Sequence, residues 1–210
     1  MNTLKTIKLF ALAILFIGLN SCNSDDEENQ QSGNLEAKRI ENFEAPGDVM
    51  DFTTNPPTVA EVRPFRYFSF SEGIEVEETA NWDIAFKGSL IKVNGGVSGD
   101  AQAEATVVTG IFNEIDSVPD TATFNTDVAD TDSSVSYAIP YGSGNGWYTF
   151  NMDTHLYSPI PGKVILIKTH DGKYAKMEIL SYYKDLESTI VNGGYYTFNY
   201  VYQPDGSVNF

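Results

Sequence analysis

Residues 195–202 read Tyr-Tyr-Thr-Phe-Asn-Tyr-Val-Tyr, and this stretch decides the fold class. Every second residue from Tyr196 to Tyr202 is aromatic, while Thr197 and Asn199 stand between them. Successive side chains of a β-strand point to opposite faces. The alternation therefore predicts a strand that turns one aromatic face toward a protein core.

Similar runs fill the chain from about residue 60 up to this strand. They are short, apolar or alternating, and separated by Gly, Asn, Asp and Pro, with no convincing 3.6-residue helical period. The clear cases are residues 64–70, 82–93, 147–152, 163–169 and 174–182. We therefore expect an all-β fold: a single domain of antiparallel strands in a two-layer or partly closed sheet, since an open aromatic sheet would expose its edges.

Two connections between these runs have the composition of tight turns. Asp171-Gly172 joins residues 163–169 to residues 174–182, and Asn192-Gly193-Gly194 precedes the last strand. Both place residues that tolerate positive φ where a hairpin needs them. Residues 97–105 carry few bulky side chains, and we expect them to form a loop or an irregular edge.

The first residues have the pattern of an export signal. Two lysines precede the apolar run 9–17, which is too short to span a bilayer but fits the hydrophobic region of a signal peptide. Residues 19–22, Leu-Asn-Ser-Cys, resemble the cleavage box of bacterial lipoproteins, and Cys22 is the only cysteine. We expect residues 1–21 to be a lipoprotein signal peptide and Cys22 to be acylated, for example with palmitate, as the mature N-terminus.

A polar stretch follows this cysteine. Residues 25–28 are four consecutive acids, and Asn, Gln, Ser and Gly continue the stretch, so it has little to bury. We expect residues 22–40 to be the lipidated N-terminus and a disordered acidic tether, and residues 41–210 to be the domain. The acids are either an export signal to the cell surface or charge on a solvated linker.

Composition excludes several functions. The chain has 29 acidic and 13 basic residues, a net charge of −16, and no basic patch with interleaved aromatics, so we expect no nucleic-acid partner. With two histidines and no HExxH, GxSxG or CxxC motif, the chain is not expected to be an enzyme. Asp127, Asp130 and Asp132 could gather calcium, but the glycine and distal glutamate of a known loop are missing, which favours an exposed acidic turn.

Several short segments, in this order and at similar spacings, resemble those of the HmuY family of haem-binding surface lipoproteins. They are Tyr67–Gly73 (YFSFSEG), Asn81–Phe86 (NWDIAF), Val93–Gly99 (VNGGVSG), Gly146–Phe150 (GWYTF), Asp171–Lys176 (DGKYAK) and Tyr196–Tyr200 (YTFNY). The resemblance covers residues 65–205 and implies an all-β lipoprotein of the outer membrane, lipid-anchored and exposed at the cell surface. It would capture haem (heme) from haemoproteins for iron acquisition and pass it to an outer-membrane receptor, touching the membrane only through its lipid.

The resemblance also implies an axial ligand for the haem iron. In the family, histidine or methionine side chains hold the iron, and one of them follows the Trp-x-x-Phe strand, which here is the position of Met152. A thioether is soft and neutral, so it binds iron without losing a proton. Alternation places Tyr148, Phe150 and Met152 on one strand face, where the two rings could stack on porphyrin. The alternative role for Met152 is to fill a gap in the core.

The second axial ligand of the family is missing, because residues 130–146 contain neither His nor Met. Tyr137, Tyr141 and His155 are the substitutes, since phenolate and imidazole both ligate haem iron. Tyr141 and His155 could also remain ordinary polar residues of surface loops. His170 is expected at an exposed hairpin tip, and Met177 in the core.

The leading hypothesis is thus a haem-binding outer-membrane lipoprotein. The alternative is a surface binding module for a glycan or peptide on the same scaffold, because a fold does not fix a function. A third is a structural coat lipoprotein without a pocket.

Overall fold

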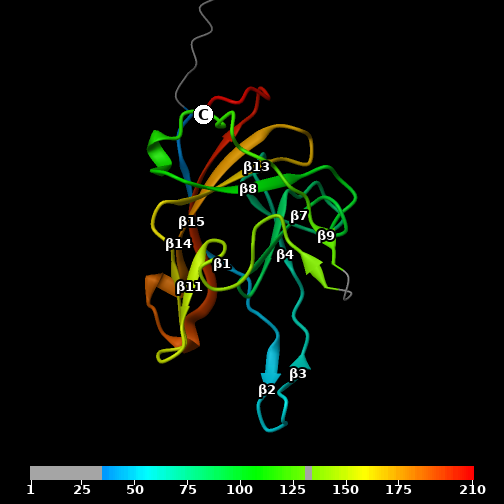
Figure 1. The fold of residues 1–210 in the computed structure, drawn as a ribbon, viewed down its shortest axis with the longest axis vertical. Coiled ribbons are helices and arrows are strands. Elements are labelled where there is room, and N and C mark those ends of the chain that lie inside the picture. Colours follow the sequence, from blue (N-terminus) through cyan, green and yellow to red (C-terminus); the bar gives the residue numbers. More distant parts are fainter. Residues whose placement is uncertain (1–34, 131–133) are drawn as a thin grey trace, which may run out of the picture. The chain divides into compact units, whose positions relative to one another are not determined.

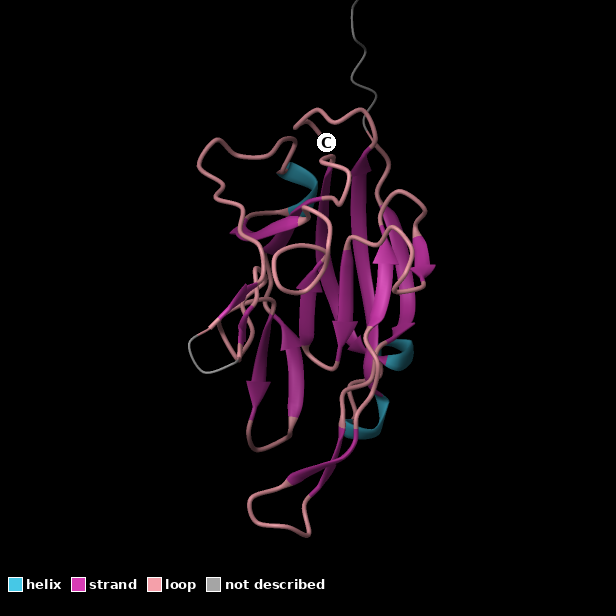
Figure 2. Ribbon diagram, turned by 90° about the vertical axis from the view of Figure 1, so that its right-hand side faces the viewer, coloured by secondary structure: helices cyan, strands magenta, loops and turns pink. Residues whose placement is uncertain are grey.

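The computed structural model describes residues 35–130 and 134–210. This part of the chain is built of β-strands with three short 3₁₀ turns (Figures 1 and 2). The strands are β1 (Lys38–Glu44), β2 (Val49–Asp51), β3 (Thr58–Glu61), β4 (Arg66–Ser69), β5 (Ile74–Val76), β6 (Ile84–Lys87), β7 (Leu90–Val93), β8 (Glu104–Thr109), β9 (Val128–Ala129), β10 (Val135–Ser136), β11 (Tyr148–Asn151), β12 (Leu156–Pro159), β13 (Lys163–Lys168), β14 (Tyr174–Tyr183) and β15 (Gly193–Gln203). In the described ranges, no helix is both long and apolar enough to cross a membrane.

β15, which contains the aromatic stretch 195–202, is one of the inner strands of the larger sheet. This sheet has five antiparallel strands in the order β1-β15-β14-β13-β8. Tyr196, Phe198 and Tyr200 of β15 are each at most 1% exposed, as their alternation predicts. A second antiparallel sheet has the order β5-β4-β6-β7. The all-β, antiparallel prediction is confirmed.

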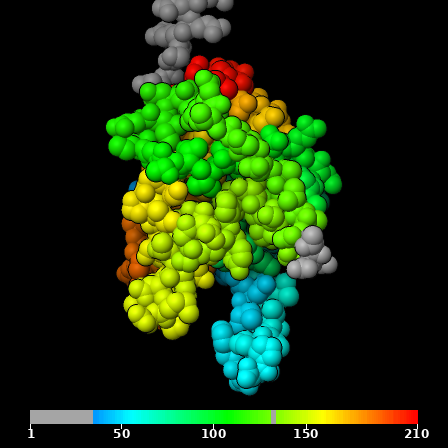
Figure 3. Space-filling view, viewed as in Figure 1, coloured from blue at the N-terminus to red at the C-terminus, as the bar shows by residue number. Residues whose placement is uncertain are grey.

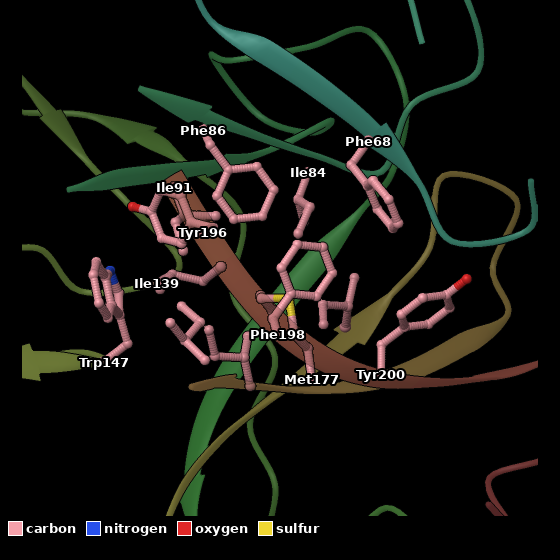
Figure 4. Close-up of a cluster of buried hydrophobic side chains, with 14 of the residues drawn as sticks. Phe68, Ile84, Phe86, Ile91, Ile139, Trp147, Met177, Tyr196, Phe198 and Tyr200 are labelled. Atoms are coloured by element: carbon pink, nitrogen blue, oxygen red, sulfur yellow. The ribbon is translucent and has the colours of Figure 1, made fainter. Parts of the chain in front are cut away.

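Aromatic rings fill the space between these two sheets (Figure 4). Phe198 of the larger sheet lies with its ring centroid 5.3 Å from that of Phe68 and 5.8 Å from that of Phe86, both from the smaller sheet. Rings in such offset and edge-on pairs bury large areas and add specific contacts. The core that joins the layers is therefore mainly aromatic, and Met177 is fully buried within it, as expected.

The other face of the larger sheet is also covered. Val164, Leu166 and Val201 pack there against Phe112 of the 3₁₀ turn Phe112–Glu114. The buried Lys176 lies on this face and donates hydrogen bonds from Nζ to the carbonyls of Phe112 and Ile115, at 2.9 and 2.8 Å. This second layer explains why Val201 of β15 is buried on the face opposite the aromatic core.

Two hairpins project from the same end of the described domain. They are β2–β3 and β11–β12, and the space-filling view shows them as separate lobes with open space between their tips (Figure 3). A third pair, β9–β10, lies beside the smaller sheet in the ribbon views. The projecting β11–β12 hairpin carries most of the expected site residues.

Of the two tight turns expected from sequence, the one at Asp171-Gly172 is confirmed and the other is wrong. Gly172 has φ +79° between β13 and β14, as the Asp-Gly turn requires. The connection before β15 instead runs through residues 184–192, with two 3₁₀ turns, so Asn192-Gly193-Gly194 is no two-residue hairpin turn. Gly194 does have positive φ, but inside β15, where an added Cβ would lie 2.9 Å from Cα of Pro46. This glycine serves close packing rather than a turn.

Two element boundaries differ from expectation. β1 already begins at Lys38, ahead of residue 41, where we expect the domain to start. It pairs with β15 as an edge strand, and Phe43 is its buried anchor. Residues 97–103 form the expected loop, but β8 begins at Glu104, within the predicted irregular stretch.

Candidate functional site

The β11–β12 hairpin carries the sequence-predicted haem residues. Its register pairs Tyr148 with Pro159 and Phe150 with Tyr157. The ring centroids of Phe150 and Tyr157 are 4.7 Å apart, so the two half-buried rings pack side by side on the hairpin. These rings give the hairpin an aromatic surface that continues toward its tip.

Met152 lies beyond the end of its strand, which corrects the expected strand face. β11 ends at Asn151, whose Oδ1 accepts hydrogen bonds from the backbone N–H groups of Asp153 and Thr154. This side chain stabilises a turn in place of a further strand residue. Met152 is 74% exposed in that turn, so its sulfur is not filling a gap in the core.

Tyr148 also differs from expectation, because its ring is buried in the core and does not lie open beside Met152. It is 4% exposed, its ring packs on Trp147 and Tyr157, and its hydroxyl accepts a hydrogen bond from Ser89. A ring held this way belongs to the core. Of the two rings expected beside Met152, only that of Phe150 lies near the surface.

His155 is exposed at the other end of the same turn. Its φ of +55° is in the left-handed region, which for a residue other than glycine is uncommon and favours a fixed turn. The ring lies 6.2 Å from that of Phe150. His155 also borders a cavity of about 220 Å³, whose other lining residues are Tyr157, Tyr182, Tyr183, Ile190 and Gly193.

The tyrosines of this cavity remain protonated at neutral pH. Burial raises the pKa of Tyr182 well above its usual value of 10, and burial also raises the pKa values of Tyr157 and Tyr183. The Tyr183 hydroxyl accepts a hydrogen bond from the Tyr157 backbone N–H at 2.6 Å. Neutral phenols offer hydrogen bonds and aromatic surface, whereas a phenolate ligand here would require a costly deprotonation.

Tyr141 lies in a loop that is hydrogen-bonded to β11. The Phe150 backbone N–H donates to Oγ of Ser143, and the Gly144 N–H donates to the carbonyl of Tyr148, both at 2.8 Å. Tyr141 itself is 61% exposed. The half-buried Tyr137 has a pKa raised by burial and, to a smaller extent, by Asp127 and Tyr141. The structure therefore gathers Tyr141, Phe150, Met152 and His155 on one loop and its neighbouring hairpin.

His170 is not at an exposed tip, contrary to expectation. Its side chain is 16% exposed, and Nδ1 lies 2.7 Å from Oδ1 of Asp83, a fully buried carboxylate. Asp83 also accepts hydrogen bonds from the backbone N–H groups of His170 and Phe70, at 2.9 and 2.7 Å. These contacts make His170 a link between the β13–β14 turn and the smaller sheet.

Asp127 does not lie in the exposed acidic turn that the sequence favours. Asp127 is fully buried, and its two carboxylate oxygens accept hydrogen bonds from the N–H groups of Val93 and Ala138. Asp127 directly precedes β9 and thus links Val93 of β7 to Ala138, which follows β10. Asp132 lies outside the described residues. Within the described ranges, no three His, Cys, Asp or Glu side chains are grouped to hold a metal ion.

The β2–β3 hairpin is an element that the sequence pattern did not predict. Its base is fixed by Asp48, which accepts a hydrogen bond from the Arg63 N–H and pairs with Lys87, and these contacts lower the pKa of Asp48. Its exposed apolar side chains are Val49, Met50, Phe52 and Val59. The signal was Val49-Met50-Asp51-Phe52, a mainly apolar run between Pro46 and Pro56, ahead of the strands that the sequence predicts from about residue 60 onward.

Fold and side chains thus define a two-layer, antiparallel β-protein with exposed thioether, imidazole and phenol groups on projecting elements. A model of the HmuY protein family matches residues 63–200. The chain belongs to the HmuY family.

Solved structures and curated proteins complete the comparison. The apo HmuY analog of Tannerella forsythia is 19% identical with a TM-score of 0.46, over 81% of this chain and 96% of that one. A candidate lipoprotein of Bacteroides fragilis gives 21% and 0.44, over 67% and 84%, and a candidate HmuY-like heme-binding protein of Bacteroides vulgatus gives 18% and 0.43, over 65% and 84%. No curated protein matches the chain in sequence.

Proposed function

We propose that this chain is a haem-binding lipoprotein that carries haem at the tip of the β11–β12 hairpin and catalyses no reaction. Membership of the HmuY family supports the class of ligand. The observation that carries the site is the exposed Met152, 74% accessible next to the aromatic surface of Phe150 and Tyr157. The acylated Cys22 and the signal peptide lie outside the described residues and complete the proposal as an anchor in the outer membrane, with a haem receptor as partner.

The chemistry of this hairpin suits a porphyrin. A porphyrin presents a wide apolar face, and aromatic side chains pack well on such a face. The thioether of Met152 is neutral, so it can approach iron without a deprotonation step. Met152 is mostly exposed within the turn, so no packing contact in the core keeps its sulfur from reaching an iron atom.

The second axial ligand is proposed to come from a neighbouring projection. Tyr141 and His155 remain candidates from the loop and the turn next to Met152. The β2–β3 hairpin adds Met50, which is 38% exposed and belongs to the other lobe at this end of the domain (Figure 3). A haem between the two lobes would turn one porphyrin face toward the β11–β12 hairpin and the other face toward the β2–β3 hairpin.

Replacing Met152 with leucine is expected to weaken haem binding by about tenfold or more, because the apolar contact remains while the iron–sulfur bond is lost. Hemin titration followed by the Soret band measures the affinity. Leu186→Ala, at another exposed apolar side chain, is the control and should bind as the unchanged chain does. No saturable one-to-one shift of the unchanged chain in either redox state would refute the function, and equal affinity of M152L would refute only this ligand.

The other ligand can be assigned with three further variants. Tyr141→Phe, His155→Ala and Met50→Leu each remove one candidate donor at an exposed position. We expect one of them, and only one, to convert the six-coordinate spectrum of the haem complex to a five-coordinate spectrum. If none does, the second ligand lies elsewhere. Only an effect of Met50→Leu supports a haem between the two lobes, because Tyr141 and His155 lie next to Met152.

A further inference from the structure

A second cavity lies away from the hairpins and shares no lining residue with the cavity beside His155. Its volume is about 580 Å³, within the range of small-molecule sites. Two loops make its walls: residues 78–82, which lead into β6, and residues 97–101, which follow β7.

The side chain of Asn94 fixes these two walls to each other. Its Nδ2 donates to the carbonyl of Trp82 at 2.8 Å, and its Oδ1 accepts from the N–H of Ala101 at 3.4 Å. Asn94 is 7% exposed, so these bonds are shielded from water. At Gly99, an added Cβ would lie 2.1 Å from the same Oδ1, so the close approach of the loop to Asn94 requires a glycine there. The cavity is therefore formed before any ligand arrives.

The lining groups mainly accept hydrogen bonds. Glu78 and Asp100 contribute exposed carboxylates, while Thr79 and Asn81 contribute an exposed hydroxyl and an exposed amide. Ser98 also lines the wall, but its hydroxyl is already bonded to the buried Asp127. Carboxylates only accept hydrogen bonds, so a partner must bring several donors.

The charges around the cavity narrow the class of ligand further. Of the described residues that line this cavity, none is Lys, Arg or His. Lys92 lies beside the cavity wall. Its Nζ donates to the carbonyl of Ser98 at 3.4 Å and packs over the rings of Phe65, Tyr67 and Trp82. An anionic ligand would meet the carboxylates of Asp100 and Glu78, and Lys92 is already engaged by Ser98 and Glu78. Hydroxyl groups of a neutral ligand can donate to both carboxylates.

We infer that this cavity, the Asn94 cavity, binds an uncharged sugar residue, through hydroxyl groups that donate to Asp100 and Glu78. The site is independent of haem. A surface protein with both sites would hold a glycan and a porphyrin on separate parts of one domain.

The test is a titration of the full mature chain with neutral monosaccharides (glucose, galactose, mannose and N-acetylglucosamine), followed by ¹H–¹⁵N NMR. We expect saturable shifts of the Ser98 to Ala101 amides and of Trp82 with at least one of these sugars, at Kd values of about 1–10 mM. Glucuronate and sialic acid should give no saturation, because their carboxylates would face Asp100 and Glu78.

Asp100→Asn is expected to weaken the sugar about tenfold or more, since the strong acceptor is lost at an exposed position. Glu77→Gln is the matched control, because Glu77 neighbours Glu78 but does not line the cavity, and it should leave binding unchanged. Met152→Leu should also leave it unchanged, which separates this site from the haem proposal. The inference is overturned if no neutral sugar saturates, if only spermidine or calcium does, or if D100N binds sugar as well as the unchanged chain.

Discussion

Replacing Phe198 with alanine is expected to destabilise the domain by about 4 kcal/mol, because a fully buried ring is lost and a cavity is left behind. Phe198 lies where the two sheets meet, and its ring contacts those of Phe43, Phe68 and Phe86 from three other strands. Neighbouring rings cannot close the space without leaving their own pairs. Urea unfolding followed by near-ultraviolet circular dichroism measures the change.

Phe52→Ala is the matched control for this prediction. Phe52 is 78% exposed beyond the end of β2, so the same atoms are removed with little loss of buried area, and a change below about 0.5 kcal/mol is expected. A loss at Phe198 no larger than that at Phe52 would show that the sheets are not joined through this ring.

Much of the fold could be predicted because buried strands carry their period in the sequence. β14 and β15 have one face in the aromatic core, and their alternation is visible without a structure. β1 was missed for the converse reason: its sequence, KRIENFE, is charged and looks like tether. As an edge strand it exposes most of its side chains, and only the pairing with β15 shows that it belongs to the domain.

The haem site stays a prediction, but the structure corrects the local geometry that the sequence implies for its residues. A two-residue period extrapolated past Phe150 puts Met152 on the face of Tyr148, yet the turn that begins at Asn151 ends the period. Sequence spacing cannot show where a strand stops when a polar side chain caps the turn from within. The same limit hides the burial of Tyr148, whose ring packs on Trp147 and on Tyr157 of the paired strand β12.

Contacts between residues that are far apart in the sequence could not be predicted from it. Asp83 and His170 are 87 positions apart, and no sequence pattern in either segment indicates that they pair. In sequence Asp83 is one of 29 acids, and His170 stands next to a turn. Their pairing makes them structural residues, and this has a strong energetic consequence.

Replacing Asp83 with alanine is expected to lower the free energy of unfolding by about 3–5 kcal/mol at neutral pH, because three buried or half-buried donors lose their acceptor. These donors are the backbone N–H groups of Phe70 and His170 and the His170 ring. Urea unfolding at pH 7 measures the loss. Asp120→Ala, at an exposed acid, is the control and should be nearly neutral.

The pH dependence of the Asp83 effect has a definite sign. Burial raises the pKa of Asp83 above its usual 3.8, and the hydrogen bonds from His170 and Phe70 offset only part of that rise. The folded chain therefore binds this proton more tightly than the unfolded chain, and the resulting stability is complete below pH 3.8 and lost as pH rises through the folded pKa. Asp83→Asn removes this titration, so the unchanged chain should lose stability relative to D83N as the pH is raised from about 4. A relative gain over the same range would mean that the hydrogen bonds to the carboxylate outweigh its burial.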